Sequence, residues 1–159
     1  MLLSFDLGLK HMGACAIEDD GKIVSWIILR PKSPSIGDIV LELDTWISCV
    51  NANNNCTRVV LERQPWTNRK MTRLLVIMET YLTVSFPSFT INKIASNTKW
   101  KFLMRDVPST YYERKRESIK SCENLLKVDE KNREWLEWFF LQEKKDDLAD
   151  AYIQGLVML

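Results

Sequence analysis

Apolar positions in the first thirty residues follow the pattern of short strands. Residues 1–5 form one apolar run, residues 14–17 form a second, and residues 23–29 are rich in β-branched side chains. The turn sequence D-D-G separates the second run from the third. These features predict a meander of three antiparallel strands at the start of the chain.

After residue 35 the apolar spacing changes to that of helices, interrupted by two further strands over 58–61 and 89–94. Helices are expected over 36–50, 71–82, 113–126, 134–140 and 147–159. Strands first, followed by strands alternating with helices, predict a mixed α/β sheet, with three antiparallel strands and then parallel strands, flanked by helices. A length of 159 residues suits a single domain over 1–159.

The helix expected over 71–82 carries more apolar surface than one core contact requires. Leu74, Met78 and Leu82 share one face, whereas Val76 and Ile77 extend the apolar surface around the helix. A helix of this kind is buried on more than one side. It is either a central core helix or the seam of a homodimer, and the pattern alone favours neither.

Charge is balanced over the chain but separated along it. The formal net charge is +1, yet residues 63–120 hold 12 lysines and arginines against 4 acids, a net of +8. The remaining residues hold 10 against 17, a net of −7. Such separation is one footprint of a polyanion ligand, although charge runs are also common on solvated surfaces.

Several protein classes are disfavoured by composition. No apolar stretch reaches the roughly 20 residues that span a bilayer, so no membrane association is expected. The chain opens on a strand-like run without a basic segment, so no signal peptide is expected and the expected location is the cytoplasm. One histidine and four cysteines without a C-x-x-C pair argue against a zinc site.

Acidic residues stand at three structurally meaningful places. Asp6 ends the first strand, Glu62 ends the strand over 58–61, and Asp147 and Asp150 lie in the first turn of the last helix. A carboxylate at the end of a buried strand is costly unless a cation pairs with it. Residues three apart share a helix face, so Asp147 and Asp150 can point the same way.

Four gathered carboxylates suit hard divalent cations, Mg²⁺ or Mn²⁺. Two such ions about 4 Å apart stabilise the attacking and leaving oxygens in phosphodiester hydrolysis. Taken singly, Asp147 and Asp150 could instead complement a helix dipole, and Asp6 could be a turn residue. Considered together with the basic middle segment, the acids favour a metal-dependent nuclease.

Four stretches resemble a known family. LSFDLGLKHMGACAIE resembles the first strand-turn-strand of RuvC-like Holliday junction resolvases, and VVLERQPW resembles their second carboxylate strand, with ERQP similar to the poxvirus enzymes. KKDDLADAYIQG is similar to their C-terminal carboxylate helix, and YYERKRESIK to a basic stretch that supplies a catalytic-site lysine. The resemblance extends over residues 3–155.

This resemblance implies an RNase H-like fold and a homodimer that cuts both strands of a four-way DNA junction, with two Mg²⁺ ions per active site. In a viral setting the location would be the host cytoplasm. The implied metal ligands are Asp6, Glu62, Asp147 and Asp150. Lys115 would stabilise developing phosphate charge. Phosphate contacts are expected from Arg63, Gln64, Arg69, Lys70, Arg73, Arg114 and Arg116.

Some alternatives remain open at this level. Asp146 competes with Asp147 as a ligand, Arg116 and Lys120 compete with Lys115, and Trp66 could either pack in the core or lie near the junction. An RNA/DNA-hybrid hydrolase of the same fold, or a junction-binding module without activity, would fit the same strands. A sugar-kinase-like ATPase fits less well, because the chain has five glycines and no second D-x-G.

Overall fold

The computed structural model describes all 159 residues apart from the side chain of Asn53. Its sheet has five strands in the order β3-β2-β1-β4-β5. The strands are β1 (Leu2–Asp6), β2 (Met12–Ile17), β3 (Ile23–Leu29), β4 (Arg58–Glu62) and β5 (Thr90–Ile94). The first three pair antiparallel, and β4 and β5 run parallel to β1, as the sequence predicts.

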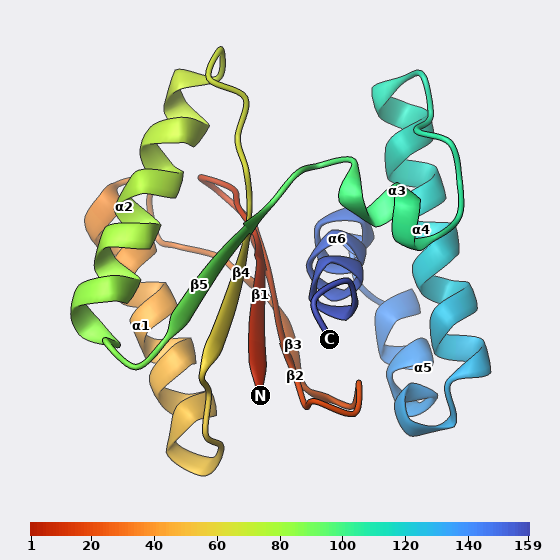
Figure 1. Ribbon diagram of the computed structural model, residues 1–159, viewed down its shortest axis with the longest axis horizontal. Coiled ribbons are helices and arrows are strands. Elements are labelled where there is room, and N and C mark those ends of the chain that lie inside the picture. The colour runs from red at the N-terminus through yellow and green to blue at the C-terminus, as the bar shows by residue number, and fades with distance from the viewer.

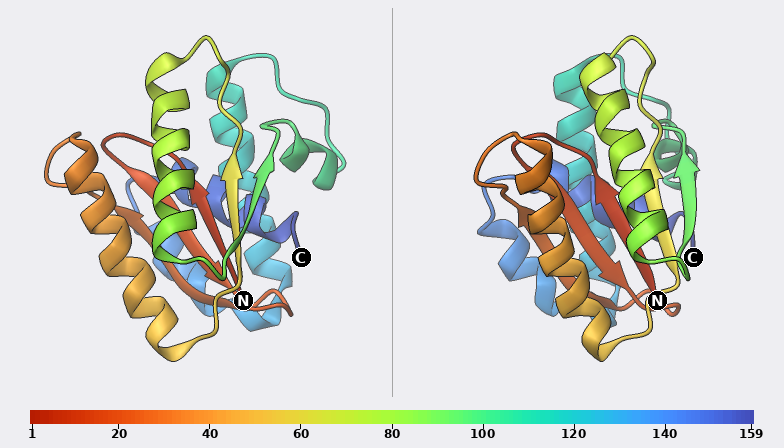
Figure 2. Two further views of the ribbon diagram at one scale, coloured as in Figure 1. Left: turned by 60° about the vertical axis from the view of Figure 1, so that its left-hand side comes forward. Right: turned by 90° about the vertical axis from the view of Figure 1, so that its left-hand side faces the viewer.

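Helices cover both faces of this sheet. They are α1 (Ile36–Asn53), α2 (Arg69–Ser85), α3 (Thr98–Phe102), α4 (Tyr111–Val128), the short 3₁₀ helix η1 (Glu130–Asn132), α5 (Glu134–Phe140) and α6 (Lys145–Leu156). Helices α1 and α2 lie on one face, and α3 to α6 lie on the other (Figures 1 and 2). In the described chain no helix combines the length and apolarity needed to cross a bilayer.

The central position of β1 follows from its sequence. Leu2, Leu3, Ser4 and Phe5 are all fully buried, because both faces of the strand are covered by helices. Leu3 and Phe5 belong to the core under α1 and α2. The strand therefore holds its last residue, Asp6, on a rigid support.

Helix α6 packs directly on β1 and β2. Gly13 on β2 makes this close approach possible, because a Cβ there would overlap the backbone carbonyl oxygen of Asp147. Gly155 does the same at the other end of the helix, where a Cβ would meet the side chain of Ile17. The first turn of α6 is thus brought next to the end of β1.

A cluster of aromatic rings fixes the layer of α5 and α6 to the sheet. Trp26 of β3 is 1% exposed, stacks on Phe139 at 5.2 Å between ring centroids, and contacts Tyr152 at 5.4 Å. Its indole Nε1 donates a hydrogen bond to the carbonyl oxygen of Leu148 at 3.0 Å. The buried indole is therefore paired, and it ties β3 to α6.

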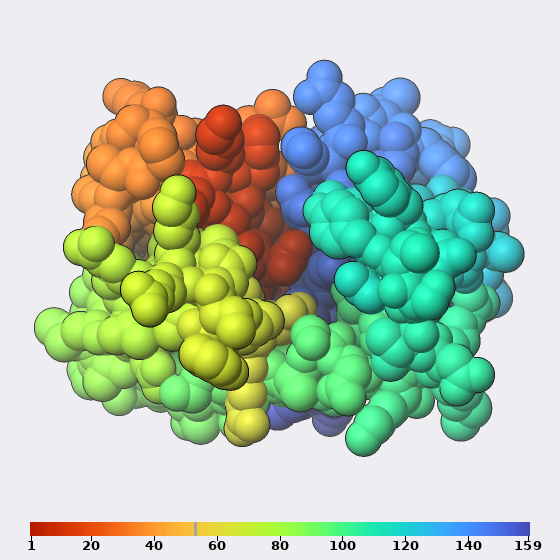
Figure 3. All heavy atoms as spheres, turned by 90° about the horizontal axis from the view of Figure 1, so that it is seen from above, coloured from red at the N-terminus to blue at the C-terminus, as the bar shows by residue number. Residues whose placement is uncertain are grey.

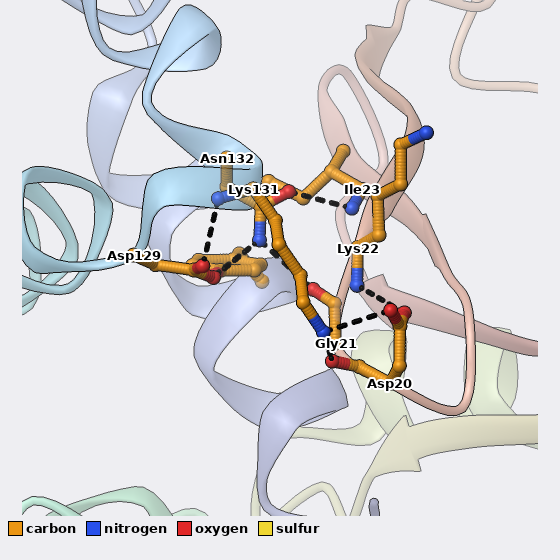
Figure 4. Close-up of polar contacts among 8 residues, drawn as sticks. Asp20, Gly21, Lys22, Ile23, Asp129, Lys131 and Asn132 are labelled. Carbon is orange, nitrogen blue, oxygen red and sulfur yellow. Dashed lines mark hydrogen bonds and ion pairs between the residues drawn. The ribbon is translucent and has the colours of Figure 1, made fainter.

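A buried asparagine joins the turn between β2 and β3 to the helical layer (Figure 4). The backbone N–H of Ile23 donates to Asn132 Oδ1 at 2.7 Å, and Asn132 Nδ2 donates to the carbonyl oxygen of Gly21 at 2.9 Å and to Asp129 Oδ2 at 2.7 Å. Asn132 is completely buried. It satisfies backbone groups that no strand or helix partner reaches.

We expect Asn132→Ala to destabilise the fold by roughly 2–4 kcal/mol, because a backbone donor and a backbone acceptor lose their partner in a buried place. Urea unfolding would measure the change. Lys131→Ala is the matched control, since Lys131 pairs with Asp20 at the exposed surface beside the same network. Equal losses in the two variants would contradict a special role for the buried amide.

The structure differs from the sequence prediction mainly in the helices. Helix α3 was not predicted, because five residues are too few to show a helical period. Helix α4 begins at Tyr111 rather than 113, since Thr110 and Glu113 form a capping box around its start. On α2 the buried face is Leu74, Leu75, Met78 and Leu82, and Val76 is 56% exposed.

Candidate active site

A polar cavity of about 760 Å³ opens at the edge of the sheet where β1 and β4 end. Figure 3 looks onto this end of the molecule and shows a hollow between the segment that follows β4 and the first half of α4. Ligands of open α/β sheets bind outside the carboxyl ends of the strands. The lining residues are Asp6, Leu7, Glu62, Gln64, Pro65, Asn68, Met71, Ser96, Asn97, Lys99, Trp100, Val107, Tyr111, Arg114, Lys115, Asp146, Asp147 and Asp150.

Asp6 and Glu62 lie side by side at the floor of this cavity. Their strands are parallel neighbours in which Phe5 pairs with Leu61, so the next residue of each strand arrives at the same edge. Gln154 of α6, only 1% exposed, donates from Nε2 to Glu62 Oε2 at 3.0 Å. This bond fixes the direction of the Glu62 carboxylate.

Three acidic residues reach the same cavity from the first half of α6. Asp146, Asp147 and Asp150 all line it. Asp147 and Asp150 follow the spacing that the sequence predicts for one helix face. Asp146 differs from the other two because it forms an ion pair with Lys115 of α4. The structure thus separates the two competing aspartates: Asp146 is paired with a lysine, whereas Asp147 has no salt-bridge partner among the described residues.

Burial, together with the neighbouring charges, disfavours the ionised forms of two of these acids, Asp6 and Glu62. Burial raises the pKa of Asp6 well above its ordinary value, and the charges of Asp150, Glu62 and Asp147 raise it further. Burial also raises the pKa of Glu62. An acid whose charged form is destabilised in this way indicates a place where a cation would be bound.

The neighbouring aspartates Asp146 and Asp147 of α6 differ in the direction in which their pKa values are shifted. Burial and the adjacent charge of Asp146 raise the pKa of Asp147 to about 6. Burial acts in the same direction on Asp146, but its hydrogen bond and ion pair with Lys115 outweigh burial and hold its pKa below the ordinary value. Of the two, Asp147 is therefore the aspartate whose charged form is disfavoured, and it has no ion-pair partner among the described residues.

Two residues in contact with the cavity acids were not predicted from the sequence: Lys99, which lines the cavity, and Gln154, which binds Glu62. Lys99, from α3, places its Nζ 2.6 Å from Asp150 Oδ1 and is only 7% exposed. A buried lysine gives no periodic pattern in a five-residue helix. Gln154 falls one turn after Asp150 on the same helix, so its i, i+4 spacing was the available clue.

The predicted phosphate-contact residues are divided between two surfaces. Gln64 and Arg114 line the cavity, and Arg69 and Arg73 line a shallow groove on the outer face of α2 together with Ile77. The others, Arg63, Lys70 and Arg116, are exposed outside the cavity. The seven predicted phosphate-contact residues therefore do not form one continuous basic surface around the acids.

Trp66 lies on the surface, so of the interpretations left open for it, packing in the core is wrong. Its side chain is 85% exposed in the segment between β4 and α2, four residues after Glu62. Trp26, Trp46 and Trp100, in contrast, are buried. Stacking on a nucleic-acid base stays the open interpretation of Trp66, because its large aromatic side chain is exposed and close in sequence to a cavity acid.

The donor set fits a hard divalent cation by its chemistry. Asp6, Glu62, Asp147 and Asp150 offer only carboxylate oxygens, and burial and mutual repulsion destabilise the charged form of Asp6. As the side chains lie, no three histidine, cysteine, aspartate or glutamate side chains among the described residues are arranged to hold one ion. Lys99 instead engages Asp150. The predicted ligand roles therefore stay predictions.

No protein-family model and no curated protein sequence matches the chain. Solved structures do. The fowlpox virus resolvase in complex with substrate Holliday junction DNA superposes with a TM-score of 0.62 at 15% identity, covering 99% of this chain and 97% of the viral chain. RuvC of T. thermophilus in complex with a Holliday junction substrate gives 0.63 at 14% identity, covering 98% and 90%. A further Thermus thermophilus RuvC structure gives 0.62 at 14%, covering 98% and 91%.

These likenesses extend over nearly the whole of each chain. They agree with the strand order, in which three antiparallel strands are continued by two parallel ones, and with helices on both faces. At this level of identity they establish the fold rather than the activity. The chain therefore has the RNase H-like fold of the RuvC-like resolvases, which confirms the fold predicted from its sequence.

Proposed function

We propose that this protein is a structure-selective endonuclease that hydrolyses phosphodiester bonds in four-way DNA junctions, with Mg²⁺ or Mn²⁺ as cofactor. The observation that carries the proposal is the meeting of Asp6, Glu62, Asp147 and Asp150 around one cavity. The fold is shared with enzymes solved on junction DNA, which supports the choice of substrate. Fold alone does not imply activity, so the acids carry the argument.

The roles of the residues follow from their chemistry. Asp6, Glu62, Asp147 and Asp150 would hold two divalent ions, which when bound supply positive charge to the attacking and leaving oxygens. Gln154 positions Glu62 through its hydrogen bond. Lys115 lines the cavity and pairs with Asp146, and with DNA bound its ammonium would stabilise negative charge on the phosphate.

The path of the DNA is proposed from the basic and aromatic residues near the cavity. Gln64 and Arg114 would contact phosphates close to the scissile bond, because both line the cavity. Arg69 and Arg73 would contact an adjoining arm along α2. Trp66, which is exposed and lines the same groove as Arg69 and Arg73, would stack on a base that the branch point leaves accessible.

The direct test compares three substrates: a synthetic four-way junction, linear duplex DNA and an RNA/DNA hybrid. We expect cleavage of the junction with Mg²⁺ or Mn²⁺, and none in chelator, because carboxylates alone cannot neutralise the transition state. Hybrid cleavage that exceeds junction cleavage would identify a hybrid hydrolase of the same fold. Junction binding without any cleavage in metal would identify a binding module.

We further propose that the outer face of α2 over residues 76–85, beyond the end of the helix that carries Arg69 and Arg73, is the seam of a homodimer. Val76 is 56% exposed and Val84 is 75% exposed, and Ile77 lines the shallow apolar grooves beside them. A junction has two-fold symmetry, and a C2 dimer would present two equivalent sites to it. An obligate seam should bury more than roughly 1,200 Å² in total.

Charges placed on that face should therefore separate the protomers. Ile77→Asp, and independently Val84→Asp, should convert a dimer at micromolar concentration into a monomer and paired cuts into single nicks, because a buried unpaired carboxylate is costly. Light scattering and a nicking assay on a circular junction substrate give the two readouts. Val128→Asp, at an exposed valine of α4, is the control. If light scattering shows that the wild-type protein is a monomer under conditions where it cleaves junctions, the proposal of a dimer through α2 is wrong.

A further inference from the structure

Lys99 is unusual among the charged residues of this chain. Among the residues that the structure describes, it is the one lysine or arginine that is buried, with 7% of its surface exposed. It sits on α3 beside Trp100, which is 1% exposed, and its Nζ lies 5.1 Å from the Trp100 ring centroid. The buried indole anchors this short helix, so Lys99 is held in place rather than free to reach solvent.

The ammonium group of Lys99 is directed at the acids of the cavity. Its Nζ lies 2.6 Å from Asp150 Oδ1, a distance typical of a charge-assisted hydrogen bond. Its charge also lowers the pKa values of Asp6 and Glu62 against the larger effect of their burial. One ammonium thus acts on at least three of the four carboxylates.

The other two cations that line the cavity are engaged elsewhere. Lys115 is bound to Asp146, the aspartate outside the proposed ligand set. Arg114 donates to the backbone carbonyl oxygen of Pro108 at 3.2 Å. Lys99 is therefore the cavity cation that forms an ion pair with a proposed metal ligand, and both Lys99 and Asp150 line the cavity.

We propose that Lys99 is a built-in counter-ion that competes with the divalent cation for Asp150. Before metal is bound, the ammonium stabilises the gathered carboxylates, and metal loading requires the Lys99–Asp150 ion pair to open. This inference rests on the proposed function, because it takes the four acids as metal ligands. It assigns Lys99 a positioning role that sets metal affinity, and it requires no proton transfer.

The consequence for metal binding is measurable without any cleavage assay. Lys99→Met keeps the length and apolar stem of the side chain and removes its charge. Titration calorimetry of the metal-free protein with Mn²⁺ should give a dissociation constant about tenfold or more lower for Lys99→Met than for wild type, because a charge a few ångströms away no longer opposes the ion. Lys99→Arg, which retains the charge, should stay close to wild type.

Lys101→Met is the matched control, since Lys101 lies on the same helix and is exposed. It should leave the Mn²⁺ affinity unchanged. In unfolding experiments without metal, Lys99→Met should lower the midpoint by leaving the acids uncompensated, and added Mn²⁺ should raise the midpoint more than in wild type. The midpoint readout also serves if Lys99→Met is too unstable for calorimetry at room temperature.

The results separate this inference from the proposed function. If wild type binds Mn²⁺ and cleaves junctions but Lys99→Met binds Mn²⁺ equally or more weakly, competition by Lys99 is wrong and the nuclease proposal stands. If neither wild type nor any variant binds Mn²⁺, both fail. Tighter binding in Lys99→Met, together with unchanged binding in Lys101→Met and Lys99→Arg, supports the competition.

Discussion

Replacing Asp6 by asparagine should abolish junction cleavage and at the same time stabilise the metal-free protein. Cleavage should fall at least roughly 100-fold, since loss of even the outer partners of a metal ligand typically costs 10–100-fold. Stability should rise because Asp6 is a buried carboxylate surrounded by the charges of Asp150, Glu62 and Asp147. Active-site residues commonly carry such a trade-off.

The sign of the stability change follows from proton linkage. The folded protein holds the Asp6 proton more tightly than the unfolded chain does, because burial and repulsion raise its pKa above 3.8. Asp147 behaves in the same way, with a pKa of about 6 in the folded state. Wild-type stability without metal should therefore decline as the pH rises from about 4 through about 6. Asp6→Asn should weaken this decline and raise the midpoint at pH 7 by a few degrees.

Thermal unfolding of metal-free protein at several pH values measures the effect, and a nicking assay in Mg²⁺ measures the activity. Glu62→Gln and Asp150→Asn should also abolish cleavage while leaving junction binding largely intact. Asp146→Asn should matter far less than Asp147→Asn, because Asp146 is paired with Lys115. The reverse ranking would mean that Asp146 belongs to the ligand set. An Asp6→Asn protein with normal activity would refute the site.

A methyl group at Gly13 should have the second large effect. In Gly13→Ala the new Cβ would overlap the carbonyl oxygen of Asp147, and a backbone atom can move only if α6 moves with it. Overpacking of this kind costs about 3 kcal/mol, which for a chain of this size lowers the unfolding midpoint by roughly 6–12 °C. Asp147 and Asp150 would shift away from Asp6, so cleavage should drop even at temperatures where the variant is folded.

Two other glycines provide the controls for this prediction. Gly37 lies in the first turn of α1 with no atom near its missing Cβ, so Gly37→Ala should stabilise the protein by about 0.5–1 kcal/mol. At Gly155 the neighbour is the end of the Ile17 side chain, which can rotate, so Gly155→Ala should cost less than Gly13→Ala. The measurements are the thermal unfolding midpoint of each variant and its junction cleavage at temperatures below that midpoint. A Gly13→Ala protein as stable and active as Gly37→Ala would contradict the close packing of α6.

The sequence by itself determined the elements whose signal is local. Apolar runs closed by an acid located β1 and β4 together with Asp6 and Glu62 at their ends, because a strand shows its burial within five residues. The i, i+3 spacing of Asp147 and Asp150 determined a shared helix face in the same way. Both inferences needed only the periods of strand and helix.

Tertiary structure alone decided how the charges of the cavity are paired. Lys99 and Asp150 are 51 residues apart, and Gln154 and Glu62 are 92 apart, so no local period relates either pair. The pairing that distinguishes Asp146 from Asp147 likewise depends on Lys115, which comes from α4. Hydrophobic periodicity reports which face of an element is buried, whereas the partner of a buried charge depends on which elements the packing of the sheet brings together.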